Sequence, residues 1–442
     1  MSAARVTPRI RVVVVDYNGG DLTIDCLEHL VASDHPADAL DLVLVDNGSQ
    51  DSVAKRVRAE LPSVRVVQSA ENRGFAGGCN LGIGDLRDVD HIALVNSDAT
   101  VSPGWLRPLL EALDQDPMVG AASPKILLAR RYRAVDISVP TARRRGDRRD
   151  LGVRVTGARI GDEDVWREVR FPAGTFGPEL DRDGTELCWT TATARVLVPA
   201  SASSAAPLEL RLDAPGAVEV TFTVEGRRTS ARVSSEPGWC AVPGDGAPFD
   251  VVNNVGTRLV EDGYAADRGW LEQDHGQYER PEDVFAWCGA AVLLRADYLR
   301  DVGTFDERLF LYSEDVELAW RGLGRGWRHR YVPGSVVRHV HAATAQRSTR
   351  TGTLKERNRL LVLVRHARPG LVARALLRYV LVTGSYARRD LLEPARAGAP
   401  VRPAVVSRRV RAFGGFLRWA PAMVRSRRAD RRRARPRPPR AG

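Results

Sequence analysis

The first third of the chain alternates short apolar runs with amphipathic segments. Continuous apolar runs are typical of strands that are buried on both faces of a sheet, and here they occupy residues 12–15, 42–45, 64–67 and 92–95. Between them, residues 22–30 and 53–61 repeat apolar side chains every three or four positions, which predicts helices. Alternation of strand and helix predicts an α/β fold with a mostly parallel central sheet and helices on both of its faces.

The pattern changes after about residue 130. Residues 130–150 are rich in arginine and show neither helical nor strand periodicity. Between residues 208 and 233, apolar and polar side chains alternate on either side of turn-like segments, which predicts a β-meander. The α/β pattern then returns, with strands expected at 290–294, 328–332 and 336–340 and a helix at 314–323. We therefore expect one α/β domain interrupted by a β-rich insert.

These patterns divide the chain into five segments. They are a nucleotide-binding half (9–133), a β-rich insert (134–248), an acceptor or catalytic half (249–345), a helical segment (346–395) and an Arg-rich tail (396–442). The insert would bind an acceptor glycan or a partner, or would be an inert or oligomerising appendage. It lacks aromatic clusters beyond Trp189 and Trp239, which does not strongly favour stacking on a sugar.

The formal charge of +11 is concentrated at the C-terminus. Residues 401–442 contain fourteen arginines and one acid, whereas the preceding 400 residues are slightly acidic together. Leucines and arginines also mix in the helical segment, so an anionic membrane surface is one expected partner and a solvated tail is the alternative. Nucleic-acid binding is not expected of the folded body, but the positive charge of the tail makes it a hypothesis for that segment. The five cysteines show no metal-binding spacing, which favours a reducing cytoplasm.

Polar side chains follow each predicted strand of the first half. They are Asp16, Tyr17, Asn18, Asp46, Asn72, Arg73, Asn80, Asn96 and Asp98. Carboxyl ends of parallel strands meet at one edge of a sheet, where ligands bind. Carboxylates can accept hydrogen bonds from ribose hydroxyls, and a metal ion together with an arginine can bind a diphosphate. Taken alone, each of these strand ends is also compatible with an ordinary turn that has no binding role. The glycine spacing at residues 74–78 does not match the dinucleotide fingerprint, so an oxidoreductase is not expected.

A second group of polar residues lies in the other half. Glu314 and Asp315 open a predicted helix, where they would complement the helix dipole or act as a general base for a hydroxyl nucleophile. His339 ends a predicted strand, and His341 follows it on the same side.

Together these residues resemble the family 2 glycosyltransferases of the GT-A fold, particularly the rhamnosyltransferase-like branch that builds bacterial polysaccharides. The resemblance covers about residues 9–130 and 250–345 in order. It is carried by Tyr17-Asn18, Val45-Asp46-Asn47-Gly48-Ser49, Asn72-Arg73-Gly74-Phe75-Ala76-Gly77-Gly78-Cys79-Asn80, Asn96-Ser97-Asp98-Ala99, Cys288-Gly289-Ala290-Ala291, Gly303-Thr304-Phe305-Asp306-Glu307, Tyr312-Ser313-Glu314-Asp315-Val316-Glu317-Leu318, Gly326-Trp327 and Val336-Val337-Arg338-His339.

The resemblance implies a role for each residue. The nucleotide would be bound by Asp16, Tyr17, Asn18, Asp46, Asn72, Arg73, Asn80 and Asn96. Asp98 matches the last acid of the family's metal-binding D-x-D element, with His339 as a further contact to Mg²⁺ or Mn²⁺. Asp315 would be the catalytic base, with Glu314 beside it. Two positions depart from the family pattern: Asp16 replaces a small uncharged residue, and Asn96 replaces the first acid.

The expected function follows from the resemblance. It is the inverting transfer of a sugar from a nucleoside-diphosphate sugar, with dTDP-rhamnose as the expected donor, to a saccharide or lipid-linked saccharide in cell-wall or surface polysaccharide synthesis. The expected location is the cytoplasm, at the inner face of the cell membrane. The alternatives are transfer of another sugar, such as galactose or mannose, and a nucleic-acid-binding or membrane-binding protein that acts through its tail.

Overall fold

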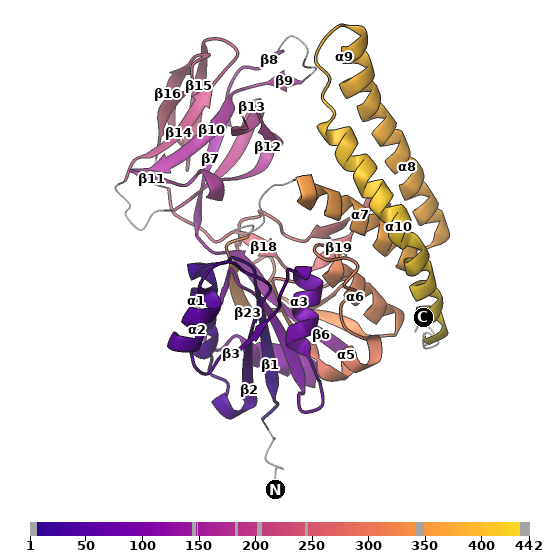
Figure 1. Ribbon diagram of the computed structural model, residues 1–442. Helices are drawn as coiled ribbons and strands as arrows, with labels where there is room; N and C mark the ends of the chain where they lie inside the picture. Colours follow the sequence, from indigo (N-terminus) through magenta and orange to yellow (C-terminus); the bar gives the residue numbers. More distant parts are fainter. Residues whose placement is uncertain are drawn as a thin grey trace, which may run out of the picture. The chain divides into compact units, whose positions relative to one another are not determined.

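The computed structural model forms two compact units (Figure 1). It describes residues 7–143, 147, 149–181, 184–200, 206–243, 246–341 and 349–433. Unit 1 comprises Met1–Ala129, Asn253–Trp270 and Gly276–Gly442, and unit 2 comprises Arg130–Val252 and Leu271–His275. The sequence had placed the insert at residues 134–248.

Unit 1 is built on a mostly parallel sheet, which confirms the predicted α/β fold class. Along the sheet the order is β21 (Glu282–Val284), β23 (Arg328–His339), β6 (Val119–Leu128), β22 (Ala291–Arg295), β4 (His91–Asn96), β1 (Ile10–Asp16), β2 (Leu40–Asp46) and β3 (Arg65–Gln68). Strand β22 runs antiparallel between β4 and β6, whereas β1, β2, β3 and β4 are parallel. β18 (Val252–Asn254) pairs with β6, and β5 (Ala99–Val101) pairs with β23.

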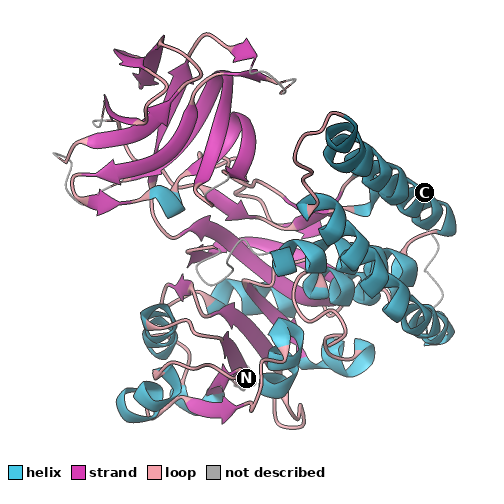
Figure 2. Cartoon of the chain, turned by 45° about the horizontal axis from the view of Figure 1, so that its top comes forward, coloured by secondary structure: helices cyan, strands magenta, loops and turns pink. Residues whose placement is uncertain are grey.

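Helices cover both faces of this sheet (Figure 2). Side chains of a strand alternate between faces; Val12 and Val14 pack with Leu27 and Leu109 on one face, whereas Val13 packs on the other. The helices are α1 (Asp21–Val31), α2 (Val53–Glu60), α3 (Gly74–Ile83), α4 (Leu106–Asp114), α5 (Ala296–Val302) and α6 (Glu314–Gly324). A hairpin of β19 (Thr257–Leu259) and β20 (Ala265–Asp267) and the short helices η1 (Ala37–Ala39) and η3 (Glu261–Gly263) complete this part.

Unit 2 is an antiparallel β-structure with its own core. Its sheet runs β16 (Arg227–Val233), β15 (Val218–Val224), β7 (Tyr132–Ser138), β13 (Glu186–Pro199), β10 (Arg154–Ile160), β14 (Leu208–Asp213) and β17 (Gly238–Val242). β11 (Glu163–Asp164) pairs with β10 and β12 (Arg170–Leu180) with β13, while β8 (Ala142–Arg143) pairs with β9 (Asp150–Leu151) and η2 spans Trp166–Glu168.

Two details of the sequence interpretation of unit 2 are wrong. β14 and β15 are strands, but three strands separate them in the sheet, so they are not neighbours in a meander. Alternation of apolar residues identifies a strand without identifying its partner. Residues 130–150 contain β7, whose Val135 and Ile137 are buried although arginines surround the strand in sequence.

The C-terminal part of unit 1 is helical. It contains α7 (Thr349–His366), α8 (Pro369–Ala387), η4 (Arg388–Leu392), α9 (Glu393–Arg396) and α10 (Ala404–Arg433). Leu360, Tyr379, Phe416 and Met423 form a buried cluster among α7, α8 and α10. Residues 404–433 are therefore a packed helix rather than a solvated tail. No helix within the described residues combines the length and hydropathy needed to cross a membrane.

Candidate active site

The predicted nucleotide-binding residues meet at one edge of the sheet in unit 1. In the parallel register, Asp16 of β1 lies beside Asp46 of β2, and Val15 lies beside Asn96 of β4. Asp98 follows directly after β4. The carboxyl ends of the three strands thus form one polar edge, as the strand pattern predicted.

Asp16 and Asp46 hold the loops of this edge in place. Asp16 is buried and accepts hydrogen bonds from Thr23 Oγ1 (2.6 Å), the Gly19 backbone N–H (3.0 Å) and Ser49 Oγ (3.0 Å). Burial raises the pKa of Asp16, although these donors oppose the shift. Asp46 accepts from the Ser49 backbone (2.9 Å) and Gln68 Nε2 (2.9 Å). Both carboxylates are therefore engaged with side-chain and backbone donors inside the protein.

Tyr17 and Asn18 extend this edge toward solvent. The Tyr17 side chain is 45% exposed. Asn18 has φ +56°, a conformation that asparagine tolerates better than most residues. Its Oδ1 accepts from the Gln50 backbone (2.8 Å), and its own N–H donates to Ser49 Oγ (3.0 Å). Both residues are thus exposed at this edge, and Tyr17 offers an aromatic ring for contact with a planar base.

Asn47 organises the turn that leads into α3. Its Oδ1 accepts from the Arg73 backbone (3.0 Å), and its Nδ2 donates to the Gly74 carbonyl (3.0 Å) and to Asn72 Oδ1 (3.3 Å). Gly74 has φ +72°, and a Cβ there would lie 2.2 Å from the carbonyl oxygen of Phe310. Only glycine fits this close approach, which explains the glycine after Arg73 in the sequence motif.

Arg73 and Asn80 both meet Glu307. Arg73 donates to one oxygen of Glu307 (2.9 Å), and Asn80 Nδ2 donates to the other (3.0 Å). Asn80 also bonds both backbone groups of Phe305, at 3.0 Å each. Asn80 is therefore occupied in joining α3 to the loop before α6. Arg73 remains half-exposed at the edge, within reach of an incoming anion that competes with Glu307.

Asp98, His339 and Asn253 form a buried line of polar groups. His339 Nε2 lies 3.0 Å from Asp98 Oδ1, and His339 Nδ1 lies 2.9 Å from Asn253 Oδ1. Burial would raise the pKa of Asp98, but His339 outweighs it and the pKa is lowered. When Nδ1–H donates to Asn253, Nε2 presents a lone pair toward the carboxylate, so a proton or a metal ion is needed between them.

This line fits a divalent cation. Mg²⁺ takes ligands at about 2.0–2.1 Å with near-octahedral angles, and adjacent ligands then lie about 3 Å apart, which is the Nε2–Oδ1 separation seen here. Asn96 Oδ1 is buried nearby without a hydrogen-bond partner, and Asn96 Nδ2 lies 3.4 Å from His339 Nε2. No group of three or more His, Cys, Asp or Glu residues suited to a metal occurs in the described residues, so water and phosphate oxygens would supply the other ligands.

Glu314 and Asp315 stand at the start of α6 after a strained loop. Phe310, Tyr312 and Ser313 have φ of +66°, +73° and +66°. Such conformations cost about 1–3 kcal/mol each for residues other than glycine, and they persist only where the surroundings enforce them. They turn the chain so that the two acidic side chains enter the helix together.

Within the described residues, neither carboxylate receives a hydrogen bond from a side chain. Glu314 is buried, and its Oε2 has no hydrogen-bond partner. Asp315 accepts from the backbone N–H groups of Val316 (2.7 Å) and Gly289 (3.1 Å). Burial raises the pKa of Glu314, and the charge of Asp315 raises it further. The pKa of Asp315 is also raised by burial, with Asp267 adding repulsion.

Asp315 is linked through one short loop to the buried line of Asp98, His339 and Asn253, which we call the metal line. Gly289 donates to Asp315, and the carbonyl of the next residue, Ala290, accepts from the Asn96 backbone (2.9 Å). The predicted base and the predicted metal site are therefore brought to the same end of the sheet, although 217 positions separate Asp98 from Asp315 in the sequence.

Asn358 of α7 holds the strained loop. It is fully buried, and its Nδ2 lies 2.8, 2.9 and 2.7 Å from the carbonyl oxygens of Leu309, Leu311 and Tyr312. Arg357 donates to the carbonyls of Arg308 (3.0 Å) and Leu309 (2.9 Å). Helix α7 therefore fixes the segment that aims Glu314 and Asp315.

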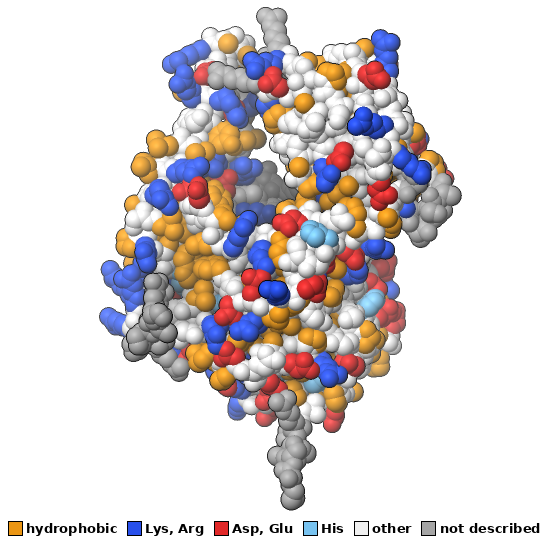
Figure 3. Space-filling model, turned by 180° about the vertical axis from the view of Figure 1, so that it is seen from behind, with side chains coloured by type: hydrophobic (Ala, Val, Ile, Leu, Met, Phe, Trp, Pro, Cys, Tyr) orange, Lys and Arg blue, Asp and Glu red, His pale blue; other side chains and the backbone are white. Residues whose placement is uncertain are grey.

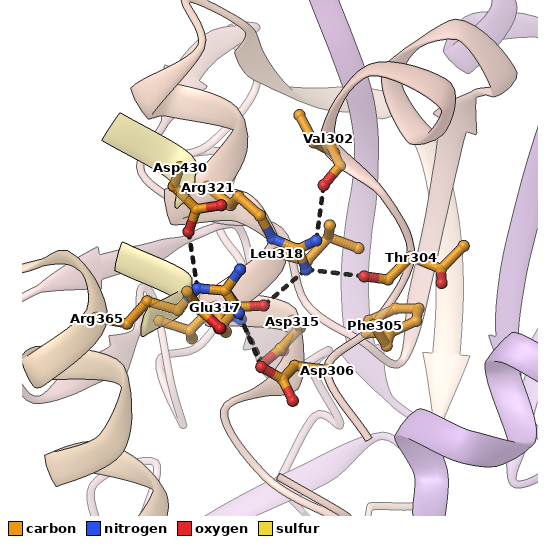
Figure 4. A network of polar contacts seen from close by, with 12 residues as sticks. Val302, Thr304, Phe305, Asp306, Asp315, Glu317, Leu318, Arg321, Arg365 and Asp430 are labelled. Carbon is orange, nitrogen blue, oxygen red and sulfur yellow. Dashed lines mark hydrogen bonds and ion pairs between the residues drawn. The ribbon is translucent and has the colours of Figure 1, made fainter. Parts of the chain in front are cut away.

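The rest of α6 is held by a buried ionic network (Figure 4). Glu317 is completely buried and contacts Arg321 (2.7 Å), Arg365 (2.8 Å) and His366 (2.9 Å). Although burial opposes it, the Arg321 and Arg365 charges and the hydrogen bond from His366 hold the pKa of Glu317 far below its usual range. Arg365 also binds Asp306 (2.8 Å) and Asp430 (2.9 Å), so the network joins α6, α7 and α10.

Several groups near the two predicted sites do not stand out in the sequence. Asp267 accepts from Asn254 Nδ2 (2.6 Å), and its charge acts on Asp315, His339 and Lys355. The Lys355 ammonium lies 4.5 Å from the centre of the Tyr312 ring. Trp270 is partly exposed and packs on His341, with ring centres 4.7 Å apart.

The buried asparagines were also missed. Asn47 and Asn358 each bond two or more groups of a distant segment, and Asn253 bonds His339. None of them carries a charge, and Asn47 is the one that lies in a motif of the resemblance. A buried polar residue within an apolar stretch is the available signal: Asn253 follows Val251-Val252, and Asn358 precedes Leu360-Leu361.

Sequence comparison identifies the family. The model described as "Glycosyl transferase family 2" matches residues 11–161, and the one described as "Glycosyl transferase family group 2" matches residues 247–383. The chain is 35% identical over 108 residues to the succinoglycan biosynthesis protein ExoO of Rhizobium meliloti (strain 1021), which covers 24% of this chain and 30% of that protein.

A longer match is with the N-acetylglucosaminyl-diphospho-decaprenol L-rhamnosyltransferase of Mycobacterium tuberculosis (strain ATCC 25618 / H37Rv). It is 24% identical over 354 residues and covers 77% of this chain and 79% of that protein. Among solved structures, the Pyrobaculum calidifontis mannosyltransferase PcManGT with GDP-Man and Mn²⁺ gives a TM-score of 0.41 at 14% identity, covering 97% and 86% of the two chains. GalNAc-T7 with UDP, GalNAc and Mn²⁺ gives 0.45 at 12% identity, covering 81% and 48%.

The two family matches fall on both halves of unit 1, which carry the polar sheet edge and the Glu314–Asp315 pair. The chain belongs to the family 2 glycosyltransferases.

Proposed function

We propose that the chain is an inverting glycosyltransferase that uses a divalent cation and moves a sugar from a nucleoside-diphosphate sugar to an acceptor hydroxyl. One observation carries this proposal: Asp315, a half-buried carboxylate that receives only backbone hydrogen bonds, is tied by the Gly289–Ala290 loop to the strand end that carries Asn96 and Asp98. A base and a cation site at the same sheet edge are what a displacement at a sugar phosphate requires.

The donor would lie along the ends of β1, β2 and β4. Tyr17 would contact the base, and Asn18, with the loops that Asp16 and Asp46 hold, would frame the base and ribose. Arg73 would exchange part of its contact with Glu307 for a contact with the diphosphate. Asn72, Asn80 and Asn96 would act by shaping this edge, because the first two are already bonded within the protein.

Asp98 and His339 would hold Mg²⁺ or Mn²⁺, with Asn253 orienting the imidazole from behind. The cation, when bound, neutralises negative charge on the leaving nucleoside diphosphate.

Asp315 is the better candidate for the base, because its side chain is partly exposed whereas Glu314 is buried. Asp315 takes the proton of the acceptor hydroxyl as the oxygen forms a bond to the anomeric carbon. The bond from that carbon to the diphosphate oxygen breaks on the opposite side, so a single displacement inverts the configuration. The raised pKa of Asp315 makes it a stronger base than an ordinary aspartate. Glu314, kept neutral by burial, would avoid adding a second negative charge.

The finer proposal is that dTDP-rhamnose is the donor and a lipid-linked saccharide is the acceptor, at the cytoplasmic face of the cell membrane. The Mycobacterium tuberculosis relative supports it, since its name specifies L-rhamnose and a decaprenol-linked acceptor. Transfer of another sugar, such as galactose or mannose, by the same arrangement is the alternative.

The test is a thermal-shift panel of dTDP, UDP and GDP and their sugar conjugates, each with and without Mn²⁺. The proposal expects dTDP ligands to raise the melting temperature most, only with the metal present, and expects Asp98→Asn to abolish the metal-dependent part. Stabilisation by UDP or GDP ligands instead would replace the donor while keeping the reaction. If no nucleotide stabilises the protein at millimolar concentration, the proposed function is wrong.

A further inference from the structure

The outer faces of helices α8 and α10 expose apolar side chains between arginines. We call this surface the α8/α10 face and define it by Leu377, Val380, Leu381, Val410, Leu417, Val424, Arg411, Arg418 and Arg425. Figure 3 shows hydrophobic and basic side chains next to one another on the left side of its view, over the C-terminal helices. Exposed apolar side chains that gather on one surface, rather than scattering singly, mark interaction sites on proteins, so this face is a candidate for a partner.

On α10, the apolar and basic positions repeat together. Val410, Leu417 and Val424 are spaced by seven residues, and each is followed directly by an arginine. Seven residues are almost two helical turns, so the side chains form two neighbouring stripes over about 21 Å of helix. Val410 and Leu417 are 58% and 56% exposed. The inner side of the helix, with Phe416 and Met423, is already buried against α7 and α8.

On α8, the exposed residues also share one side. Leu377, Val380 and Leu381 are 62%, 54% and 64% exposed and are spaced as neighbours on a helix. The opposite side is packed: Ala375 and Tyr379 are buried, and Tyr379 Oη donates to Glu356 of α7 (2.7 Å). The exposed leucines therefore contribute nothing to the core of this unit.

The positive charge of α10 indicates which kind of partner fits the α8/α10 face. Helix α10 contains ten arginines and one acidic residue. Within the described residues, Arg411, Arg418 and Arg425 form no ion pair with a carboxylate. A second copy of this chain would bring an equally basic helix and be repelled. A nucleic acid would pair with the arginines but would leave the leucines in water. The interface of an anionic bilayer accepts both, with arginines at the headgroups and leucines at the acyl boundary.

We propose that the α8/α10 face docks on an anionic lipid bilayer, with both helices lying on the membrane surface. The docking itself follows from this face alone. Its value for catalysis rests on the proposed function, because a lipid-linked acceptor would be held at the same surface. Asp430 and Ser426 on the last turns of α10 bind Arg365 (2.9 Å) and Arg308 (2.9 Å), so the docked helix directly supports the segment before Asp315.

The test is co-sedimentation of the full chain with phosphatidylcholine vesicles and with phosphatidylcholine–phosphatidylglycerol vesicles. We expect binding only to the vesicles that contain phosphatidylglycerol. Replacing Arg411, Arg418 and Arg425 by Gln should weaken binding about a hundred-fold, since each basic residue near the surface contributes about 1 kcal/mol. Replacing Leu377, Leu381 and Leu417 by Ser should weaken it at least about tenfold.

Matched controls use exposed residues outside the face. Arg87, Arg107 and Arg228 are replaced by Gln in one variant, and Val31 and Leu180 by Ser in another; both should sediment like the parent. Equal loss of binding in controls and test variants overturns the proposal. So does an absence of vesicle binding in the parent, including the case in which the parent instead binds a DNA duplex or self-associates through these leucines.

A soluble acceptor separates this proposal from the proposed function. Sugar transfer to a water-soluble saccharide should be the same in the α8/α10 variants and the parent, because the substitutions lie on the outer face. Vesicle binding without any sugar transfer would leave the docking surface intact and disprove the proposed function. Sugar transfer without vesicle binding would support the proposed function and disprove the docking surface.

Discussion

Two pairs of acidic side chains in unit 1 are treated by the fold in opposite ways. Asp16 and Asp46 each accept two or more hydrogen bonds and hold loops at the sheet edge. Glu314 and Asp315 share only backbone donors at the start of α6, and one oxygen of Glu314 has no partner. Side-chain donors from neighbouring segments hold the first pair, whereas Asp315 receives hydrogen bonds from backbone N–H groups alone. The kind of donor, rather than the number of hydrogen bonds, separates the candidate base from the structural acids here.

The largest effect should come from Asp315→Asn. The amide cannot take a proton, so the rate of transfer should fall about a thousand-fold, within the range that general bases supply. Nucleotide-dependent stabilisation in a thermal-shift assay should stay as in the parent. A transfer rate that hardly changes would show that Asp315 has a structural role, as Asp16 has.

Asn358→Ala should have the next largest effect. Loss of its bonds to three carbonyls frees the loop before α6 and displaces Asp315, and a misplacement of about 1 Å can cost a hundred-fold in rate. We expect kcat to fall by more than the donor KM rises, because the freed loop leads directly to Asp315 and reaches the donor edge only where the Phe310 carbonyl meets the turn before α3. If kcat and donor KM change by the same factor, the loop serves the whole fold rather than the base.

Asn253→Ala tests the metal line. Removing the group behind His339 should raise the Mn²⁺ concentration needed for half-maximal thermal stabilisation by nucleotide by roughly tenfold to a hundred-fold. The stabilisation at saturating Mn²⁺ should recover. An unchanged metal requirement would show that Asn253 does not orient His339 for a cation.

Glu314→Gln should give the smallest effect, in the direction of stability. Because burial raises the pKa of Glu314 above its usual 4.5, the folded protein keeps a proton that the unfolded chain releases. The stabilising contribution is present at low pH and is lost as the pH rises toward the folded pKa. Gln should therefore add about 1 kcal/mol to the free energy of unfolding at neutral to mildly alkaline pH, and nothing at acidic pH. Urea unfolding at both pH values checks this, and equal curves would mean that Glu314 is ionised at no cost.

Much of the fold could be predicted from sequence, because buried parallel strands are continuous apolar runs and the strand ends carry recognisable polar residues. Asp16, Asp46, Asp98 and His339 lie where the strand pattern put them. The pairing within unit 2 could not be predicted, since alternation in β14 or β15 does not specify a partner strand. Asn253 and Asn358 were missed for a similar reason: their importance depends on carbonyl and imidazole groups that only the tertiary structure brings near.

The position of β22 has a consequence for how the chain folds during synthesis. This strand lies between β4 and β6, yet residues 129–290 separate it from β6 in the chain. Until the ribosome releases β22, the facing edges of β4 and β6 have no backbone partner and can pair with the wrong chain. Unit 2 is made in this interval, and its Tyr132–Phe249 pairing draws the two ends of the insert together. Once the insert has folded, the long connection between β6 and β22 acts as a shorter loop, and closing a shorter loop costs less entropy. The insert that interrupts the catalytic unit therefore also shortens the conformational search by which β22 finds its place between β4 and β6.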